Sequence, residues 1–280
     1  MMQNQSLRFL VVKAHPHDFT HCAGTCGIHA SQGDSITVVS MTNGVGTHNE
    51  RLYDELLKPE AEQDPEIINQ SADDYARLKE EEFRKVCALF GVTDVRILDF
   101  PDKPFHNTPE AVEVLRQIIY DVRPHVLITQ RPHLSGRNAM ASGAHNDHDE
   151  TAFAIMEAQG LAGTPNYGSR QRPHTIAATY YPGVYYMQDE IDFYVDISDW
   201  KEKRVEAEIL FSSQGHTETF ARKRIELHTG HAGWYARTGY AEGFVRANPE
   251  VLSRIHVPET ALRRASEPRQ NYLKRLAGEL

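Results

Sequence analysis

The sequence predicts an α/β protein with a Rossmann-like, mainly parallel sheet and helices on both of its faces. Apolar, β-branched runs of strand length recur in the first half of the chain, and stretches of helical length lie between them. Strand and helix therefore alternate, an order that is typical of a parallel sheet. The expected strands are Arg8–Ala14, Ser35–Met41, Val95–Phe100 and His125–Thr129.

The helices expected between these strands cover Cys22–Ser31, Ser71–Phe90 and Pro109–Val122. Asp73 and Asp74 lie in the first turn of the second helix, where acidic side chains interact favourably with the helix dipole. Gly91 is suited to the end of that helix. Each crossover thus has the helix that a parallel sheet requires.

The second half of the chain is less regular, so its elements are expected only near certain residues. They are a helix near Asp149–Gln159, strands near Thr175–Tyr181 and Phe193–Ile197, and a helix near Trp200–Ser213. We expect residues 1–250 to form one domain. Residues 251–280 should form a helical tail that could pack on the body or on another subunit, which leaves a homo-oligomer open.

One polar segment, Asn43–Asn69, interrupts the alternation of strands and helices. It is rich in glutamate and shows little periodicity, so we interpret it as a long loop. Open α/β sheets bind ligands at the carboxyl ends of their strands, and we expect the loop to lie there. A disordered insertion is the alternative.

The composition excludes several classes of protein. A net charge of −9 without a long basic stripe argues against a nucleic-acid partner, which would need clustered lysines and arginines. No apolar run approaches the length of a membrane span, so no membrane partner is expected. The first residues lack the pattern of a signal peptide, and the three cysteines are an odd number, so a reducing, cytoplasmic setting fits best.

Two clusters of possible metal ligands follow expected strands. The first strand runs directly into Lys13-Ala14-His15-Pro16-His17-Asp18, and the fourth is followed by Gly143-Ala144-His145-Asn146-Asp147-His148. In a parallel sheet both clusters reach the same edge. Two imidazoles and one carboxylate form a ligand set of hydrolytic zinc sites, which leave a position open for water and lower its pKa to about 7. The sequence therefore predicts a hydrolytic metal site.

The same two clusters resemble the PIG-L/LmbE-like family, whose patterns are A-H-P-D-D-E, then G-G-T, and later H-P-D-H. The corresponding residues here are Ala14-His15-Pro16-His17-Asp18-Phe19, Ala23-Gly24-Thr25 and His145-Asn146-Asp147-His148. Weaker similarities extend as far as Phe244. The resemblance implies a Rossmann-like hydrolase that removes acetyl or related acyl groups from amino sugars.

The resemblance also implies roles for individual residues. His15, Asp18 and His148 would be the metal ligands, with Zn²⁺ as the expected ion and Fe²⁺ or Mn²⁺ as alternatives. His145 would stabilise the oxyanion or protonate the leaving amine, and Asp147 would orient the imidazole of His145.

One departure from the family pattern concerns the general base. The first aspartate of the D-D pair, which deprotonates the metal-bound water, is replaced by His17. Neutral imidazole can accept a proton, so we expect His17 to be the base and to face the open metal position.

The expected function is hydrolysis of an N-acyl amide, by preference N-acetyl, of an amino sugar or sugar conjugate through a metal-bound hydroxide. The small-molecule substrate is thus an N-acylated amino sugar or a related amide. One alternative is a catalytically silent metal- or sugar-binding protein on the same scaffold. Another is an amidase acting on thiol conjugates or natural products, because substrate choice depends on loops such as Asn43–Asn69.

Overall fold

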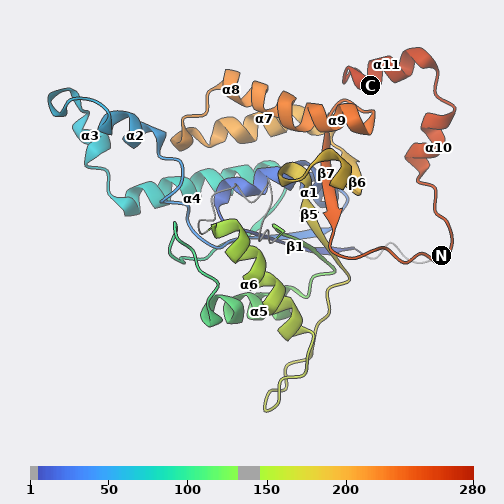
Figure 1. Ribbon diagram of the computed structural model, residues 1–280, viewed down its shortest axis with the longest axis horizontal. Helices are drawn as coiled ribbons and strands as arrows, with labels where there is room; N and C mark the ends of the chain where they lie inside the picture. Colours follow the sequence, from blue (N-terminus) through green and yellow to red (C-terminus); the bar gives the residue numbers. More distant parts are fainter. Residues whose placement is uncertain (1–5, 132–145) are drawn as a thin grey trace.

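A seven-stranded sheet with the strand order β3-β2-β1-β4-β5-β7-β6 lies at the centre of the protein (Figure 1). The computed structural model describes residues 6–131 and 146–280. The strands are β1 (Arg8–Lys13), β2 (Ser35–Ser40), β3 (Asp94–Ile97), β4 (Val126–Ile128), β5 (Ala178–Pro182), β6 (Phe193–Asp196) and β7 (Ala241–Arg246). The first five strands run parallel, and β7 is antiparallel to β5 and β6. The mainly parallel sheet is confirmed.

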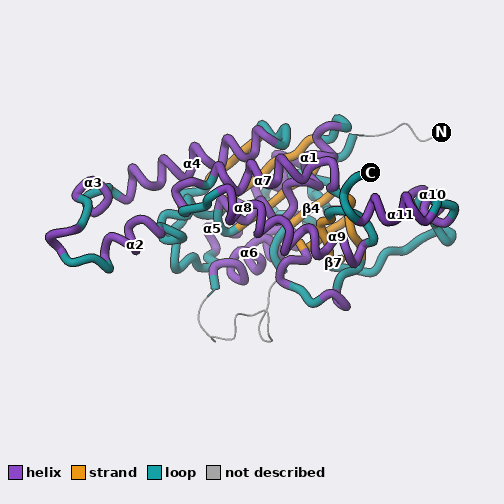
Figure 2. The backbone as a smooth tube through the Cα atoms, turned by 90° about the horizontal axis from the view of Figure 1, so that it is seen from above, coloured by secondary structure: helices purple, strands orange, loops and turns teal. Residues whose placement is uncertain are grey.

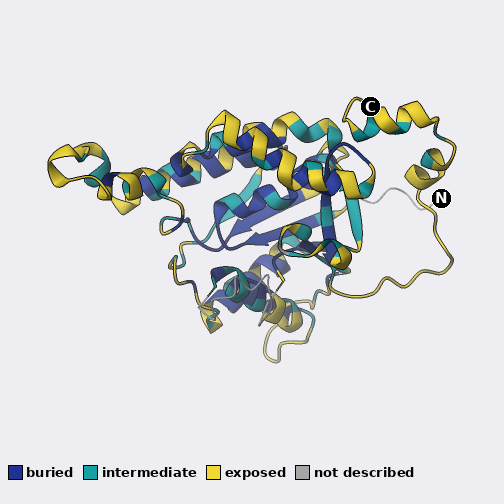
Figure 3. Cartoon of the chain, turned by 45° about the horizontal axis from the view of Figure 1, so that its top comes forward, coloured by how far each residue is buried: buried dark blue, intermediate teal, exposed yellow. Residues whose placement is uncertain are grey.

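Helices cover both faces of this sheet (Figures 1 and 2). On one face lie α1 (Ala23–Ser31), α4 (Ala72–Leu89) and α7 (Lys201–Leu210), and on the other lie α5 (Pro109–Val122) and α6 (Asp147–Ala162). Successive side chains of a strand point to opposite faces. Phe9 and Val11 of β1 therefore pack in the first core layer, and Leu10 and Val12 pack in the second. Both layers are fully buried around β1 (Figure 3).

The strand order places a ligand crevice next to β1. Its neighbours are β2 on one side and β4 on the other, so the connections that leave β1 and β4 diverge at the carboxyl edge of the sheet. The first predicted ligand cluster follows Lys13 at this edge, and the described residues of the second, 146–148, lie at the beginning of α6.

The segment 43–69 contains two short helices, so the expected irregular loop is wrong in part. These are α2 (Glu50–Leu56) and α3 (Pro65–Ile68), each capped by an acceptor side chain, Asn49 and Asp64. They are too short to show a periodic pattern. The buried ammonium group of Lys79 in α4 donates to the carbonyl groups of Gly44 and Thr47 and thereby holds the start of this segment beside the carboxyl edge.

The second half also departs from expectation at several points. Strand β7 was not predicted, because Glu242 and Gly243 interrupt its apolar pattern. Helix α7 ends at Leu210, and the helices α8 (Glu218–Ile225) and α9 (His231–Ala236) were not predicted. The short 3-10 and π segments are η1 (Pro16–Cys22), η2 (Glu60–Glu62), η3 (Gly183–Tyr185), η4 (Gln188–Glu190), η5 (Ser198–Trp200), η6 (Ser212–Gln214) and η7 (Glu226–Gly230).

The C-terminal tail forms two helices, α10 (Glu259–Ala265) and α11 (Arg269–Leu276). Pro268 separates them because proline cannot continue a helix at that point. They lie at one end of the protein, beyond β6 and α9 (Figures 1 and 2). Among the described residues no helix is both long and apolar enough to cross a membrane. The domain division at residue 250 and a homo-oligomer stay predictions.

Candidate metal centre

A 3-10 turn after β1 places two predicted ligands side by side. Pro16 occupies the first position of η1, where its fixed φ angle and missing N–H are tolerated. The backbone N–H of His15 donates to Asp18 Oδ2 at 3.1 Å, and the backbone N–H of Asp18 donates to the carbonyl of His15 at 3.1 Å. The two side chains are thereby fixed at the edge of the sheet before any ligand is bound.

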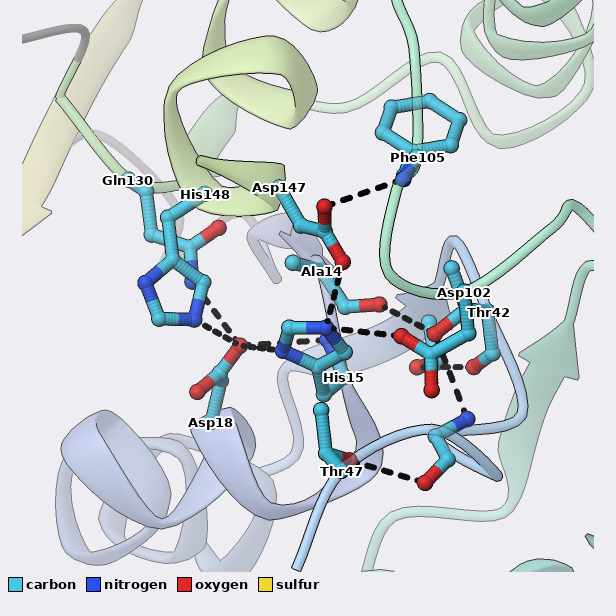
Figure 4. Close-up of polar contacts among 12 residues, drawn as sticks. Ala14, His15, Asp18, Thr42, Thr47, Asp102, Phe105, Gln130, Asp147 and His148 are labelled. Atoms are coloured by element: carbon cyan, nitrogen blue, oxygen red, sulfur yellow. Dashed lines mark hydrogen bonds and ion pairs between the residues drawn. The ribbon is translucent and has the colours of Figure 1, made fainter. Parts of the chain in front are cut away.

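The third predicted ligand, His148, lies in the first turn of α6 and meets the same carboxylate (Figure 4). Its Nε2 is 3.2 Å from Asp18 Oδ2, and His15 Nδ1 is 3.6 Å from that oxygen. The ligand atoms of all three residues lie within 4.8 Å of one another. Gln130, just after β4, donates to Asp18 Oδ2 at 2.9 Å. The structure thus brings together the three residues that the motifs indicated.

Two further carboxylates hold the opposite edge of the His15 ring. His15 Nε2 lies 3.1 Å from Asp102 Oδ1 and 3.1 Å from Asp147 Oδ2. Asp147 also accepts a hydrogen bond from the backbone N–H group of Phe105 (Figure 4), and another from that of Lys103. If these carboxylates hold the proton on Nε2, the lone pair of Nδ1 is directed at Asp18 and His148. Outer carboxylates orient metal-ligating imidazoles in the same way.

The predicted role of Asp147 was to orient His145. The carboxylate of Asp147 contacts His15, and His145 lies outside the described residues. That part of the prediction stays a prediction.

The charges at this centre fit a divalent cation. Burial alone would raise the pKa of Asp18, but the neighbouring His148 and His15 outweigh it and hold that pKa well below its usual range. Burial alone would lower the pKa of His15, but Asp102, Asp147 and Asp18 together raise it. Three carboxylates around two imidazoles attract positive charge, and a His₂Asp donor set suits Zn²⁺ and related ions.

His17 lies beside this centre and belongs to a second cluster. Its Nε2 is 2.9 Å from Glu208 Oε2, an oxygen that also lies 3.4 Å from His216 Nδ1 and 3.4 Å from Arg224 Nε. The ring of His17 packs edge-on against Phe211, and burial lowers its pKa despite the opposing effect of Glu208. Whether His17 Nδ1 faces the metal position, as predicted, stays a prediction.

One cavity of about 750 Å³ is lined by His15, Asp18 and His148 of the first cluster and by His17 of the second. The turn after β1, the first turn of α6, the segment after β2 and the α7–α8 region line it. Its polar lining residues include His15, His17, Asp18, His21, Thr47, His48, Asn146, Asp147, His148, Gln214, Arg224 and His228. Its volume is in the range of small-molecule sites.

Several residues of the site were not anticipated from the sequence. Asp102 follows β3 in Pro101-Asp102-Lys103-Pro104, and its position beyond the end of a strand is the same feature that indicated Asp18. Glu208 lies on the buried face of α7 beside Val205, where a carboxylate needs a compensating partner. Gln130 and Arg224 had no distinguishing pattern.

Comparison with known proteins gives matches along most of the chain. The family described as PIG-L: GlcNAc-PI de-N-acetylase matches residues 10–159. The diacetylchitobiose deacetylase of Thermococcus kodakarensis is 27% identical over 264 residues, which cover 90% of this chain and 87% of that protein. The 1D-myo-inositol 2-acetamido-2-deoxy-alpha-D-glucopyranoside deacetylase of Streptomyces griseus is 29% identical over 188 residues, 63% of this chain and 56% of that protein.

Two solved structures share the fold. The 4-carboxy-2-hydroxymuconate hydratase GalB of Pseudomonas putida superposes with a TM-score of 0.70 at 20% identity, covering 89% of this chain and all 100% of that one. The N,N'-diacetylchitobiose deacetylase of Pyrococcus horikoshii superposes with a TM-score of 0.65 at 21% identity, covering 88% and 86%. These structures share the Rossmann-like architecture expected from the sequence.

Proposed function

The chain belongs to the PIG-L family, and from this we propose that it is a metal-dependent hydrolase that removes an N-acetyl group from an amino sugar. The observation that supports this most strongly is the convergence of His15, Asp18 and His148 on one cavity. The relatives that are named deacetylases act on acetylated sugars, and one of them aligns with 90% of the chain.

We propose Zn²⁺ as the ion, held by His15 Nδ1, Asp18 and His148 Nε2, with Fe²⁺ and Mn²⁺ as alternatives because the same donors accept them. Such an ion supplies Lewis acidity, which polarises an amide carbonyl and makes water a better nucleophile at neutral pH. Asp102 and Asp147 keep the proton on Nε2 of His15, so that its other nitrogen stays available.

His17 is proposed as the group that accepts the proton of the attacking water. The ionised carboxylate of Glu208 lies 2.9 Å from Nε2, so the proton of the neutral ring stays on Nε2 and the lone pair is on Nδ1. Nδ1 is then the acceptor that general-base catalysis requires. By its place in the second motif, His145 would stabilise the oxyanion or donate to the departing amine.

A second candidate function is the hydration of a carbon–carbon double bond in a carboxylated substrate. A carboxylate in the general-base position is absent, since His17 occupies it, and the buried Arg204 lines a cavity next to the metal centre. These features would suit an acidic substrate, and a protein named as a hydratase shares the fold.

The test is a substrate panel assayed in two ways with the purified, metal-containing protein. Acetate release from N-acetylglucosamine, N,N'-diacetylchitobiose and acetamidosugar conjugates measures deacetylation, and loss of ultraviolet absorbance from unsaturated carboxylates measures hydration. We expect acetate release that disappears in Asp18→Asn. Loss of absorbance without any release of acetate would contradict the deacetylase function and support the hydratase function.

A further inference from the structure

A second cavity, which we call the inner cavity, opens from the candidate metal pocket. It has a volume of about 360 Å³ and is lined by η1, α7, α8, η7, β7 and the segment before β6. His21, Val184, Arg224 and His228 line both cavities, so the two are adjacent. A substrate bound at the metal centre could therefore extend one of its groups into the inner cavity.

Arg204 of α7 is a buried cation on the wall of the inner cavity. Only 3% of the residue is exposed, and its Nε and Nη1 have no hydrogen-bond partner among the described residues. Among the described residues it forms an ion pair with Glu242, whose Oε1 lies 3.4 Å from Nε. Buried donors without partners are costly, and native proteins rarely leave them so. The guanidinium group is thus available to a ligand.

Glu242 is already committed to other donors. Its two oxygens accept hydrogen bonds from the backbone N–H groups of Gly24 and Thr25, at 2.9 and 2.8 Å, and from Thr25 Oγ1 at 2.6 Å. The carboxylate thereby anchors the beginning of α1 to β7. These three hydrogen bonds hold the carboxylate towards α1, and its contact with Arg204 is an ion pair at 3.4 Å without a hydrogen bond.

Arg224 of α8 stands where the two cavities meet. Its Nε lies 3.4 Å from Glu208 Oε2, and its side chain lines the metal pocket and the inner cavity alike. Glu208 is in turn held by His17 and His216. Both glutamates on the cavity wall, Glu208 and Glu242, therefore have partners of their own, whereas Arg204 keeps two donors without a hydrogen bond among the described residues.

We propose that the inner cavity binds a carboxylate group of the substrate, with Arg204 as the buried anchor and Arg224 at the entrance. A guanidinium group presents parallel N–H donors that match the two oxygens of a carboxylate. The two glutamates on the same wall would repel a phosphate dianion more strongly than a singly charged carboxylate. The inference rests on the proposed function, and it makes the substrate an acetamido sugar that carries an acidic group.

Substrate preference provides the first arm of the test. The kcat/KM for acetate release is compared for N-acetylglucosamine, its 6-carboxylate (the uronic acid) and its 6-phosphate. We expect the carboxylate to be preferred over the neutral sugar by roughly 10–100-fold, the scale of a buried charged hydrogen bond. A higher kcat/KM for the 6-phosphate than for the 6-carboxylate would contradict the proposal that the cavity prefers a carboxylate. Equal kcat/KM values for all three sugars would contradict the proposal that the cavity binds an acidic group of the substrate.

Direct binding provides the second arm, which does not depend on turnover. Calorimetric titration with glucuronate, which has no amide to cleave, is carried out on the wild type, Arg204→Met and the matched control Lys203→Met, whose cation lies on the exposed side of α7. We expect Arg204→Met to weaken binding by roughly tenfold or more, and the control to leave it unchanged. Arg204→Lys keeps the positive charge but loses the paired N–H donors of the guanidinium, so its affinity for glucuronate should lie between those of Arg204→Met and the wild type. This variant replaces Arg204→Met if the latter does not fold.

The two arms separate the inference from the function on which it rests. If neutral acetamido sugars are deacetylated but Arg204→Met does not change glucuronate binding, the inner-cavity site is contradicted. The proposed deacetylase activity is then still supported. Glucuronate binding that depends on Arg204, without acetate release from any sugar, supports the site and contradicts the deacetylase.

Discussion

Two clusters of two histidines and one carboxylate share the turn after β1, and their surroundings differ. In the first, His15 and His148 meet Asp18, and additional carboxylates from Asp102 and Asp147 hold the far side of His15. In the second, His17 and His216 meet Glu208, whose Oε2 also lies 3.4 Å from the guanidinium of Arg224.

This difference supports the proposal that the first cluster, and not the second, holds the metal. Among the described residues no lysine or arginine forms an ion pair with Asp18 or Asp102, so the first cluster has excess negative charge. The second carboxylate already has a cation of its own, and His216 Nδ1 lies 3.1 Å from the backbone carbonyl of Glu208, to which it can donate. Although the two clusters contain similar side chains, the first is therefore suited to metal binding and the second to proton transfer.

The largest effect should follow from removing a ligand of the first cluster. We expect Asp18→Ala or His148→Ala to reduce bound metal from about one per chain to a small fraction, because two remaining ligands cannot close the site. Elemental analysis of protein purified without added metal measures this. The matched variant His216→Ala removes a histidine of the second cluster and should leave the metal content unchanged.

The next largest effect should appear in catalysis with the metal retained. His17→Ala should lower kcat by roughly 10²–10⁴-fold, the scale for loss of a general base, and His17→Asp should retain partial activity. Metal content is measured on the same samples. Unchanged kcat would remove His17 from the mechanism, and loss of metal would make His17 a ligand.

A smaller effect is expected from the carboxylates that orient His15. Asp102→Asn keeps the shape of the side chain but weakens its hold on Nε2, and should lower metal affinity by roughly 10–100-fold. Competition with a chelating dye gives the affinity. If affinity does not change, Asp147 alone is sufficient to orient the ring.

The smallest expected effect concerns stability through Glu208. Burial alone would raise the pKa of Glu208, but His17, His216 and Arg224 hold it well below its usual range. A lowered carboxyl pKa stabilises the fold above the ordinary value of about 4.3, and that contribution is lost as the pH falls towards the folded-state pKa. Glu208→Gln should therefore reduce the free energy of unfolding by about 1–3 kcal/mol at pH 7.

Urea unfolding of the chelator-treated wild type and Glu208→Gln at pH 7, 5 and 3 measures this contribution. The difference in the free energy of unfolding between the wild type and Glu208→Gln should be similar at pH 7 and pH 5 and smaller at pH 3. A difference that grows as the pH falls would contradict the ionised state assigned to Glu208.

Much of the fold, and the meeting of His15, Asp18 and His148, could be predicted because both depend on local patterns. The buried parallel strands are continuous apolar runs, and His15, Asp18 and His148 lie next to such strands or a helix start in the sequence. Strand β7 was missed because its inward-facing Glu242 is buried through partners distant in sequence, Thr25 and Arg204. No local pattern indicates such a pairing.

The same limit applies to the partners of the site residues. The contact between His17 and Glu208 joins residues 191 positions apart, and Asp147 reaches His15 across 132 positions. The motifs indicated that His17 and Asp147 matter, but the partner of each depends on how α6 and α7 pack on the sheet. Only the tertiary arrangement shows that His17 belongs to a cluster of its own.

Anomalous diffraction from crystals of the protein grown with Zn²⁺, recorded on both sides of the zinc absorption edge, tests the difference between the two clusters most directly. We expect one strong peak among His15, Asp18 and His148 and none among His17, Glu208 and His216. A peak in the second cluster with none in the first would contradict the proposed metal site.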